Sequence, residues 1–234
     1  MSIRLPGGFL LVIEGIDGAG KSTQANALAH TLADRGLDVV QTREPTDGPW
    51  GRRIRESATT GRMTPQEELN AFIQDRKQHV AELIRPGLAE GKVVVMDRYY
   101  FSTVAYQGAR GLDPAELLRL NESFAVEPDL LVVIDLPAEV GLKRVGHRDG
   151  AGNEFETLTQ LTRSREIFRS LQKSYLVELD GTLSPDTLRA EMLAAFHRAA
   201  RRKVADRPGG SDAERQAVLR AIDGVACTGT GSTA

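Results

Sequence analysis

The sequence predicts an α/β fold: a five-stranded parallel sheet with helices on both faces. Short apolar runs rich in β-branched residues alternate with longer segments whose apolar residues recur at a helical period. This alternation is typical of parallel sheets that are covered on both sides. The first apolar run, 9–14, leads into a glycine-rich loop and then into a helical pattern. A chain of 234 residues is long enough for one such domain with its own core.

Each element follows from its local pattern. The predicted strands are the apolar runs at 9–14, 39–42, 93–96, 130–134 and 176–179. The predicted helices are 21–35, 64–90, 113–125, 138–147, 157–174 and 184–200. Helix 64–90 has the clearest start, because Thr64 can cap it, Pro65 suits the first helical position and Glu67 suits the third. Pro86 is expected to kink or end this helix.

The chain is expected to form one domain over residues 1–200. Three glycines between two helical stretches predict a mobile loop at 146–153. After residue 200 the composition changes to a basic run, an Arg-Pro-Gly-Gly linker and a small, polar end. We therefore expect residues 201–234 to form a linker, a short helix and a disordered tail.

Composition argues against several classes of protein. The net charge of −2 gives no overall basic field for nucleic acid or an anionic membrane. The apolar runs are far shorter than the ~20 residues that cross a bilayer. The first eight residues lack the apolar core of a signal peptide, and the one cysteine, Cys227, cannot form an internal disulfide. A cytoplasmic protein without a nucleic-acid or membrane partner is the expectation.

The glycine-rich loop carries the strongest chemical signal. Residues 15–22 read Gly-Ile-Asp-Gly-Ala-Gly-Lys-Ser and fit the motif of a phosphate-binding loop between a strand and a helix. Its backbone N–H groups converge on phosphate oxygens, Lys21 reaches the terminal phosphates and Ser22 is a ligand for Mg²⁺. The motif predicts a P-loop NTPase fold that binds a nucleoside triphosphate. The expected nucleotide-binding residues are Gly15, Ile16, Asp17, Gly18, Ala19, Gly20, Lys21, Ser22 and Thr23.

A second signal lies at the end of the strand 93–96, where Asp97 and Arg98 follow four apolar residues. A carboxylate at this place acts on Mg²⁺ or its waters. The Arg98 guanidinium can bind a phosphate through bidentate hydrogen bonds. Alternatively, it forms a structural salt bridge. At the end of another strand, Arg43 can hold a second phosphate or fasten its loop through Glu44.

Helix 64–90 has one charged residue on its apolar face. Arg76 shares that face with Phe72 and other apolar residues, and a buried guanidinium is costly unless it is paired. Either a protein carboxylate pairs with Arg76, or the face lines a pocket and a ligand does. Phe72 is either a core residue or a platform for a planar base.

These motifs together resemble those of the thymidylate kinase family. The resemblance runs from about residue 9 to residue 200. It includes Glu-Gly-Ile-Asp-Gly-Ala-Gly-Lys-Ser-Thr-Gln at 14–24, Thr-Arg-Glu-Pro at 42–45, Asp-Arg-Tyr at 97–99 and Ser-Thr-Val-Ala-Tyr-Gln-Gly-Ala at 102–109. It implies transfer of a phosphoryl group from ATP to dTMP in the presence of Mg²⁺, by a homodimer that serves dTTP biosynthesis.

The resemblance also implies how the acceptor base is bound. Phe72 would stack on thymine and Arg76 would bond a base carbonyl. Thr103 and Gln107 would read the remaining edge of the base.

For the rest of the acceptor, the resemblance implies that Asp17 meets the sugar near its 3′-hydroxyl. Arg43 and Arg98 would hold the acceptor phosphate. Some family members carry an arginine at the position of Gly18. Here the resemblance implies a closing lid at about 144–156, whose basic residues Arg144 or Arg148 would act on the transferred phosphoryl group instead.

Two departures from the family pattern leave other functions open. The Gly-Gly that usually follows Arg-Glu-Pro is replaced by Thr-Asp-Gly-Pro-Trp at 46–50, and the lid is poor in arginine. One alternative is a P-loop kinase for another nucleotide or nucleoside. The other is a nucleotide-binding sensor with low turnover.

Overall fold

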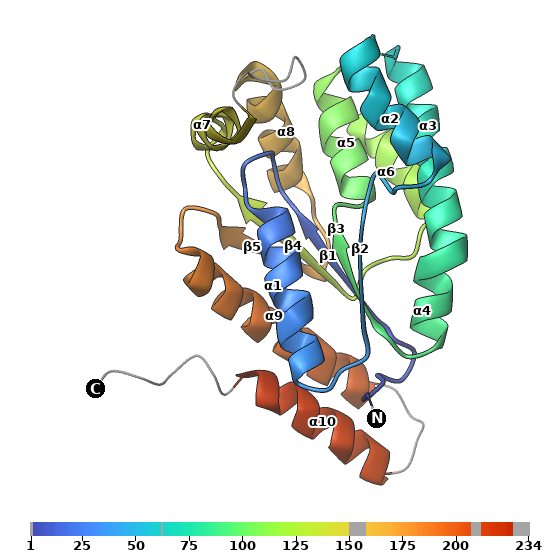
Figure 1. Cartoon of the computed structure of the whole chain (residues 1–234), viewed down its shortest axis with the longest axis vertical. Coiled ribbons are helices and arrows are strands. Elements are labelled where there is room, and N and C mark those ends of the chain that lie inside the picture. Colours follow the sequence, from blue (N-terminus) through green and yellow to red (C-terminus); the bar gives the residue numbers. More distant parts are fainter. Residues whose placement is uncertain (1, 62, 150–157, 207–211, 227–234) are drawn as a thin grey trace.

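A computed structural model describes residues 2–61, 63–149, 158–206 and 212–226 and confirms the predicted parallel sheet (Figure 1). The five strands lie in the order β2-β3-β1-β4-β5, and every neighbouring pair is parallel. They are β1 (Phe9–Glu14), β2 (Val39–Arg43), β3 (Val93–Asp97), β4 (Leu130–Asp135) and β5 (Leu176–Asp180). The central strands β1 and β3 are buried along their whole length, as their continuous apolar sequences require.

Strand register brings the chemical residues to one edge of the sheet. Asp97 pairs with Ile13 on one side and with Arg43 on the other. The loop that follows β1 therefore starts at the centre of the carboxyl edge, beside the ends of β2 and β3. Ligands of open α/β sheets bind at this edge.

The helices cover both faces of the sheet (Figure 1). Helices α1 and α9 pack against each other and against strands, while α4 packs on β3 and α8 on β4. The helical segments are α1 (Lys21–Asp34), α2 (Pro49–Thr60), α3 (Pro65–His79), the π-helical turn η1 (Val80–Ile84), α4 (Arg85–Ala89), α5 (Tyr100–Ala109), α6 (Pro114–Glu122), α7 (Ala138–Asp149), α8 (Leu158–Ser170), α9 (Pro185–Asp206) and α10 (Asp212–Ala226). None of them is long and apolar enough, within the described ranges, to span a membrane.

The predicted helix 64–90 begins as expected but continues differently. Thr64 forms both hydrogen bonds of a capping box with Glu67. Pro86 does not end the helix, because the backbone widens before it: the N–H of Arg85 donates to the carbonyl oxygen of Val80, five residues earlier. The π-helical turn takes up the irregularity that proline would otherwise cause, and α4 continues to Ala89.

Two helices, α2 and α5, are absent from the sequence prediction. Helix α2 begins Pro-Trp-Gly, and glycine is a poor helix former. Helix α5 is short and contains Thr103 and Val104 among aromatic residues, which favour strands over helices in isolation. Most of its residues are buried, so tertiary packing determines its conformation.

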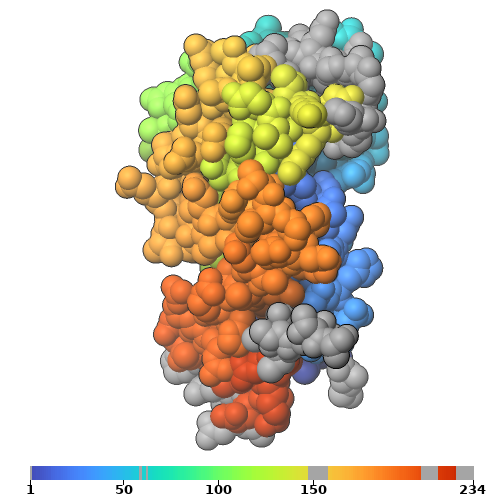
Figure 2. Space-filling model, turned by 90° about the vertical axis from the view of Figure 1, so that its left-hand side faces the viewer, coloured from blue at the N-terminus to red at the C-terminus, as the bar shows by residue number. Residues whose placement is uncertain are grey.

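Beyond residue 200, the described residues 201–206 and 212–226 are helical, and a short helix was part of the expectation for this region. Helix α9 continues to Asp206, with Val204 buried in the main core. Helix α10 packs against α9 (Figure 2), and its residues Val218, Ala221 and Ile222 join the same core. The segments 207–211 and 227–234, where we expected the linker and the disordered tail, lie outside the described residues.

Because α10 belongs to the core, a core substitution in it should destabilise the whole protein. Ile222 is fully buried, and Ile222→Ala is expected to lower the free energy of unfolding by about 2–5 kcal/mol. Arg220→Ala, at an exposed position of the same helix, is the matched control. Urea denaturation measures both variants, and equal stabilities would show that α10 does not pack on the core in solution.

Candidate active site

The phosphate-binding loop joins β1 to α1 at the centre of the sheet edge. Gly15 has φ +141°, and a Cβ there would lie 2.5 Å from the carbonyl oxygen of Ile134. Gly18 has φ +82°, and a Cβ there would lie 2.4 Å from the carbonyl oxygen of Gly141 in α7. Only glycine fits these two positions, so this loop has no room for an arginine at Gly18.

Lys21 lies across the loop at the start of α1. Its side chain is 5% exposed, and Nζ donates a hydrogen bond of 2.8 Å to the carbonyl oxygen of Ile16. Burial lowers the pKa of Lys21 to about 8, with the charge of Arg98 acting in the same direction. A phosphate beside this ammonium would offset the burial that lowers its pKa.

Ser22 and Asp97 form a site that fits Mg²⁺. The Ser22 hydroxyl donates to Asp97 Oδ2, while Asp97 Oδ1 is buried and lacks a hydrogen-bond partner within the described part of the chain. Hydroxyl and carboxylate oxygens are ligands that Mg²⁺ prefers, and this ion completes its shell with waters and substrate phosphates. The unpartnered oxygen is therefore a suitable ligand for Mg²⁺.

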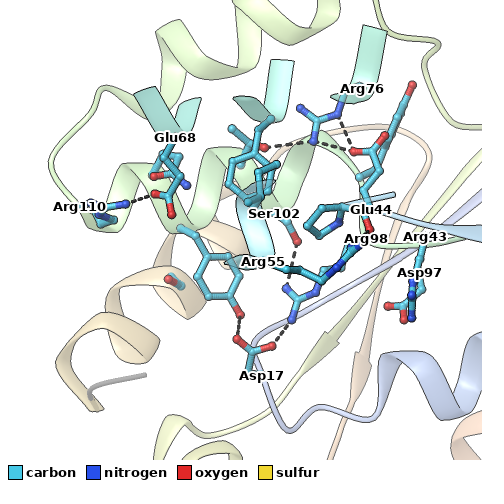
Figure 3. A pocket seen from close by; sticks show the side chains of 18 of the residues that line it. Asp17, Arg43, Glu44, Arg55, Glu68, Arg76, Asp97, Arg98, Ser102 and Arg110 are labelled. Atoms are coloured by element: carbon cyan, nitrogen blue, oxygen red, sulfur yellow. Dashed lines mark hydrogen bonds and ion pairs between the residues drawn. The ribbon is translucent and has the colours of Figure 1, made fainter. Parts of the chain in front are cut away.

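Arg98 and Asp17 meet at the mouth of the phosphate-binding loop (Figure 3). The Arg98 guanidinium contacts the Asp17 carboxylate, and the Tyr106 hydroxyl donates to Asp17 Oδ2 at 2.9 Å. Burial alone would raise the pKa of Asp17, but the charges of Arg98 and Lys21 hold it below its usual range. Asp17 is thus an anion among cations, which accounts for a carboxylate in a phosphate-binding loop.

The backbone of Arg98 is unusual, because its φ of +68° is the only positive value at a non-glycine position in the described residues. Such a conformation is strained and persists only where neighbours hold it. Glu14, at the end of β1, accepts hydrogen bonds from the N–H of Tyr99 at 2.7 Å, the N–H of Ser102 at 2.9 Å and the Ser102 hydroxyl at 2.6 Å. Arg98 Nη1 in turn donates to Ser102 Oγ at 3.3 Å. Glu14 therefore holds both the backbone turn and the start of α5.

Burial raises the pKa of Glu14 from 4.5 to about 7, and this makes a prediction about pH. A raised pKa contributes stability below pH 4.5 that is lost as the pH rises to about 7, in total about 3 kcal/mol. In Glu14→Gln the amide oxygen can accept from the N–H groups of Tyr99 and Ser102, the amide NH2 can donate to the Ser102 hydroxyl oxygen, and the side chain does not titrate. Urea denaturation from pH 5 to pH 8 should show wild-type stability falling relative to that variant, and parallel profiles would contradict it.

Arg76 is paired by the protein itself. The side chain is 1% exposed, and Nε donates to Glu44 Oε2 at 2.8 Å, Nη1 to Asn121 Oδ1 at 2.6 Å and Nη2 to Thr103 Oγ1 at 3.1 Å. His79 Nδ1 lies 3.1 Å from the other oxygen of Glu44. Of the two alternatives for Arg76, pairing with a protein carboxylate is the one observed. Arg76 also lines the cavity described next.

A cavity of about 580 Å³ connects these groups. At one end lie Asp17 and Arg98, and at the other lies Arg76 with Glu44 (Figure 3). Phe72 is half-buried on its wall and belongs to neither apolar core cluster, which favours the reading as a platform. The sequence-predicted residues that line the cavity are Asp17, Ser22, Arg43, Phe72, Arg76, Asp97, Arg98, Thr103 and Gln107.

The cavity also contains residues that the sequence prediction did not assign to the site. They are Glu44, Pro45, Ile54, Arg55, Glu68, Tyr99, Ser102, Tyr106, Arg110, Gln160 and Ser164. Tyr99, Ser102 and Tyr106 fall inside the family-like motifs and could have been found there. The residues of α2 and α8 carry no sequence signal, because only the packing of these helices brings them to the cavity.

The altered loop after Pro45 is fastened by ion pairs and hydrogen bonds. Asp47 pairs with Arg43 and with Arg55 of α2, each at 2.9 Å. Thr46 donates to Asp75 through its N–H at 2.8 Å and its hydroxyl at 2.6 Å. Arg43 therefore fastens its loop through Asp47, not through Glu44, and its guanidinium still lines the cavity.

The two lid arginines lie away from this cavity or outside the described side chains. Arg144 Nη1 donates to the carbonyl oxygen of Gly18 at 3.2 Å and to that of Gly181 at 3.3 Å, so it contacts the phosphate-binding loop. The side chain of Arg148 and most of the expected lid, 150–156, lie outside the described residues. Their predicted role stays a prediction.

Comparison with known proteins identifies the family. A family model described as thymidylate kinase matches residues 13–192. A thymidylate kinase from Xanthomonas campestris pv. campestris (strain B100) is 49% identical over 189 residues, which cover 80% of this chain and 83% of the relative. One from Xanthomonas oryzae pv. oryzae (strain PXO99A) is 47% identical over 214 residues, 91% of this chain and 92% of the relative. The chain therefore belongs to the thymidylate kinase family.

Proposed function

We propose that this protein transfers the γ-phosphoryl group of ATP to the 5′-phosphate of dTMP and so produces dTDP and ADP for dTTP biosynthesis. Family membership supports the reaction. The observation that carries it is the single cavity that joins the phosphate-binding loop and Arg98 to Phe72, Thr103 and Gln107. Such a cavity can hold a phosphate at one end and a planar base at the other.

The reaction needs positioning and charge neutralisation more than a strong base. The acceptor is a phosphate with a second pKa near 6, so it is mostly a dianion at neutral pH. Arg98 would orient this dianion, and Lys21 with the loop N–H groups would hold the donor phosphates in line with it. Ser22 and Asp97 would hold Mg²⁺, which neutralises charge on the phosphate oxygens when bound.

The remaining roles in the proposal concern the nucleoside. Asp17, held by Tyr106 and Arg98, would accept a hydrogen bond from the 3′-hydroxyl of the sugar. Phe72 would stack on the base, and Arg76 with Thr103 would serve one base carbonyl. A homodimer in the cytoplasm is part of the same proposal, and sedimentation velocity tests the dimer.

The test is a coupled assay of ADP release with ATP and Mg²⁺, in which dTMP, dUMP, thymidine, dCMP, dGMP and AMP are offered in parallel. We expect the highest kcat/KM with dTMP. The preference over dUMP rests on one methyl group and should be about 10–200-fold at most. No turnover with any acceptor, in a protein that still binds ATP, would overturn the proposal in favour of a sensor.

A further inference from the structure

Ser164 of α8 has no role in the family-like motifs, yet its hydroxyl is unusual. The residue is fully buried and lines the cavity, and its Oγ has no hydrogen-bond partner within the described residues. Buried hydroxyl groups are nearly always hydrogen-bonded, and an exception calls for an explanation. An absent ligand is one such explanation.

Two other hydroxyls of α8 show the hydrogen bond that Ser164 could have made. Thr162 donates to the carbonyl oxygen of Leu158 at 2.8 Å, and Ser170 donates to that of Ile167 at 2.7 Å. This bond to the preceding turn is the usual local solution for a hydroxyl on a helix. Ser164 does not form it, although the preceding turn offers the same acceptors.

Helix α8, which carries Ser164, packs against α5, which carries Thr103 and Gln107. Phe168, one turn after Ser164, contacts the ring of Tyr106 edge-on with centroids 6.5 Å apart. Ile167 approaches Gly108 so closely that a Cβ on that glycine would lie 2.9 Å from Ile167 Cδ1. Gln107 lies between Tyr106 and Gly108 in the sequence of α5, and Ser164 and Gln107 both line the cavity.

Gln107 also has a side-chain atom without a hydrogen-bond partner. It is 3% exposed, and its Oε1 is also buried without a hydrogen-bond partner among the described residues. The cavity thus offers an unmatched acceptor, Gln107 Oε1, and an unmatched donor, the Ser164 hydroxyl. The 2,4-dione of a thymine base presents the complement, because one N–H donor stands between two carbonyl acceptors.

We propose that Ser164 is a substrate-binding residue that donates a hydrogen bond to one of the two base carbonyls of the acceptor nucleotide, while Gln107 accepts from the N–H between them. Arg76 and Thr103 would serve the other carbonyl. This inference rests on the proposed function, since it takes dTMP as the ligand. It adds α8, which directly follows the expected lid, to the elements that recognise the base.

The first test is Ser164→Ala. Loss of one neutral hydrogen bond should raise the KM for dTMP and weaken dTMP binding by about fivefold, with little change in kcat because the base is remote from the reacting phosphates. The thermal midpoint should not fall, because the hydroxyl has no partner to lose. Ser170→Ala, on the exposed part of the same helix, is the control and should behave like wild type.

Thio-substituted substrates separate a direct contact from a structural effect. Sulfur is a weak acceptor, so wild type should bind either 2-thio-dTMP or 4-thio-dTMP about fivefold more weakly than dTMP. Ser164→Ala, which already lacks the bond, should bind that analogue as well as it binds dTMP. Which analogue does so identifies the carbonyl. Equal penalties in both proteins with both analogues, or unchanged dTMP binding in Ser164→Ala, would overturn the inference.

Calorimetry of dTMP binding keeps the two proposals distinguishable. If wild type binds dTMP but transfers no phosphoryl group, the proposed reaction fails while the binding comparison still decides the role of Ser164. If wild type does not bind dTMP, both proposals are overturned.

Discussion

Arg98→Ala is expected to lower kcat/KM for dTMP by about 10³-fold, a typical effect for an arginine that neutralises charge in phosphoryl transfer. The guanidinium lines the cavity and contacts Asp17, so its loss removes a cation from the acceptor end and leaves that carboxylate without its main partner. ATP affinity should stay within about twofold, because the loop and Lys21 remain. Steady-state kinetics and ATP titration measure the two effects separately.

The backbone of Arg98 requires a second variant, because alanine keeps a Cβ at φ +68° and so keeps the strain. Arg98→Gly suits that conformation and removes the same guanidinium. We expect it to be as inactive as Arg98→Ala but more stable to urea. Recovery of turnover in the glycine variant would assign the loss to backbone strain, and near-normal turnover in both variants would remove Arg98 from the acceptor site.

Much of the fold could be predicted because its signals are local. The three central strands β1, β3 and β4 are apolar runs, and burial on both faces selects such runs. The edge strands β2 and β5 are more polar and only partly buried. The capping residues Thr64 and Glu67 are three positions apart in the sequence, so their hydrogen bonds could be foreseen. Helix α5 could not, because its aromatic and β-branched residues contradict its conformation and only burial against α8 and α6 stabilises it.

The site shows the same limit at the level of single residues. The sequence indicated that Arg76 is a charge on an apolar face, but its partner Glu44 is 32 positions away and no spacing rule connects them. Glu14 lies within a recognised motif, yet its three hydrogen bonds to the start of α5 depend on the pairing of β1 with β3. Ser164 has no local signal at all, because its distinctive property is a missing partner.

The second large effect is on stability, where Glu44→Ala is expected to cost about 3–5 kcal/mol. The substitution leaves the Arg76 guanidinium, 1% exposed, without its carboxylate, and it removes the acceptor opposite His79. An unpaired charge in the interior keeps its full desolvation cost. Urea denaturation at neutral pH measures the loss.

Two comparisons make this prediction specific to burial. Asp47→Ala breaks ion pairs of similar length with Arg43 and Arg55, but these side chains are exposed, so the loss should be far smaller. The double variant Glu44→Met with Arg76→Met removes both charges and should recover most of the stability while turnover with dTMP stays low. Equal losses of stability for Glu44→Ala and Asp47→Ala would show that water reaches the Arg76 guanidinium. Arg76 would then be available to a ligand while it stays paired with Glu44.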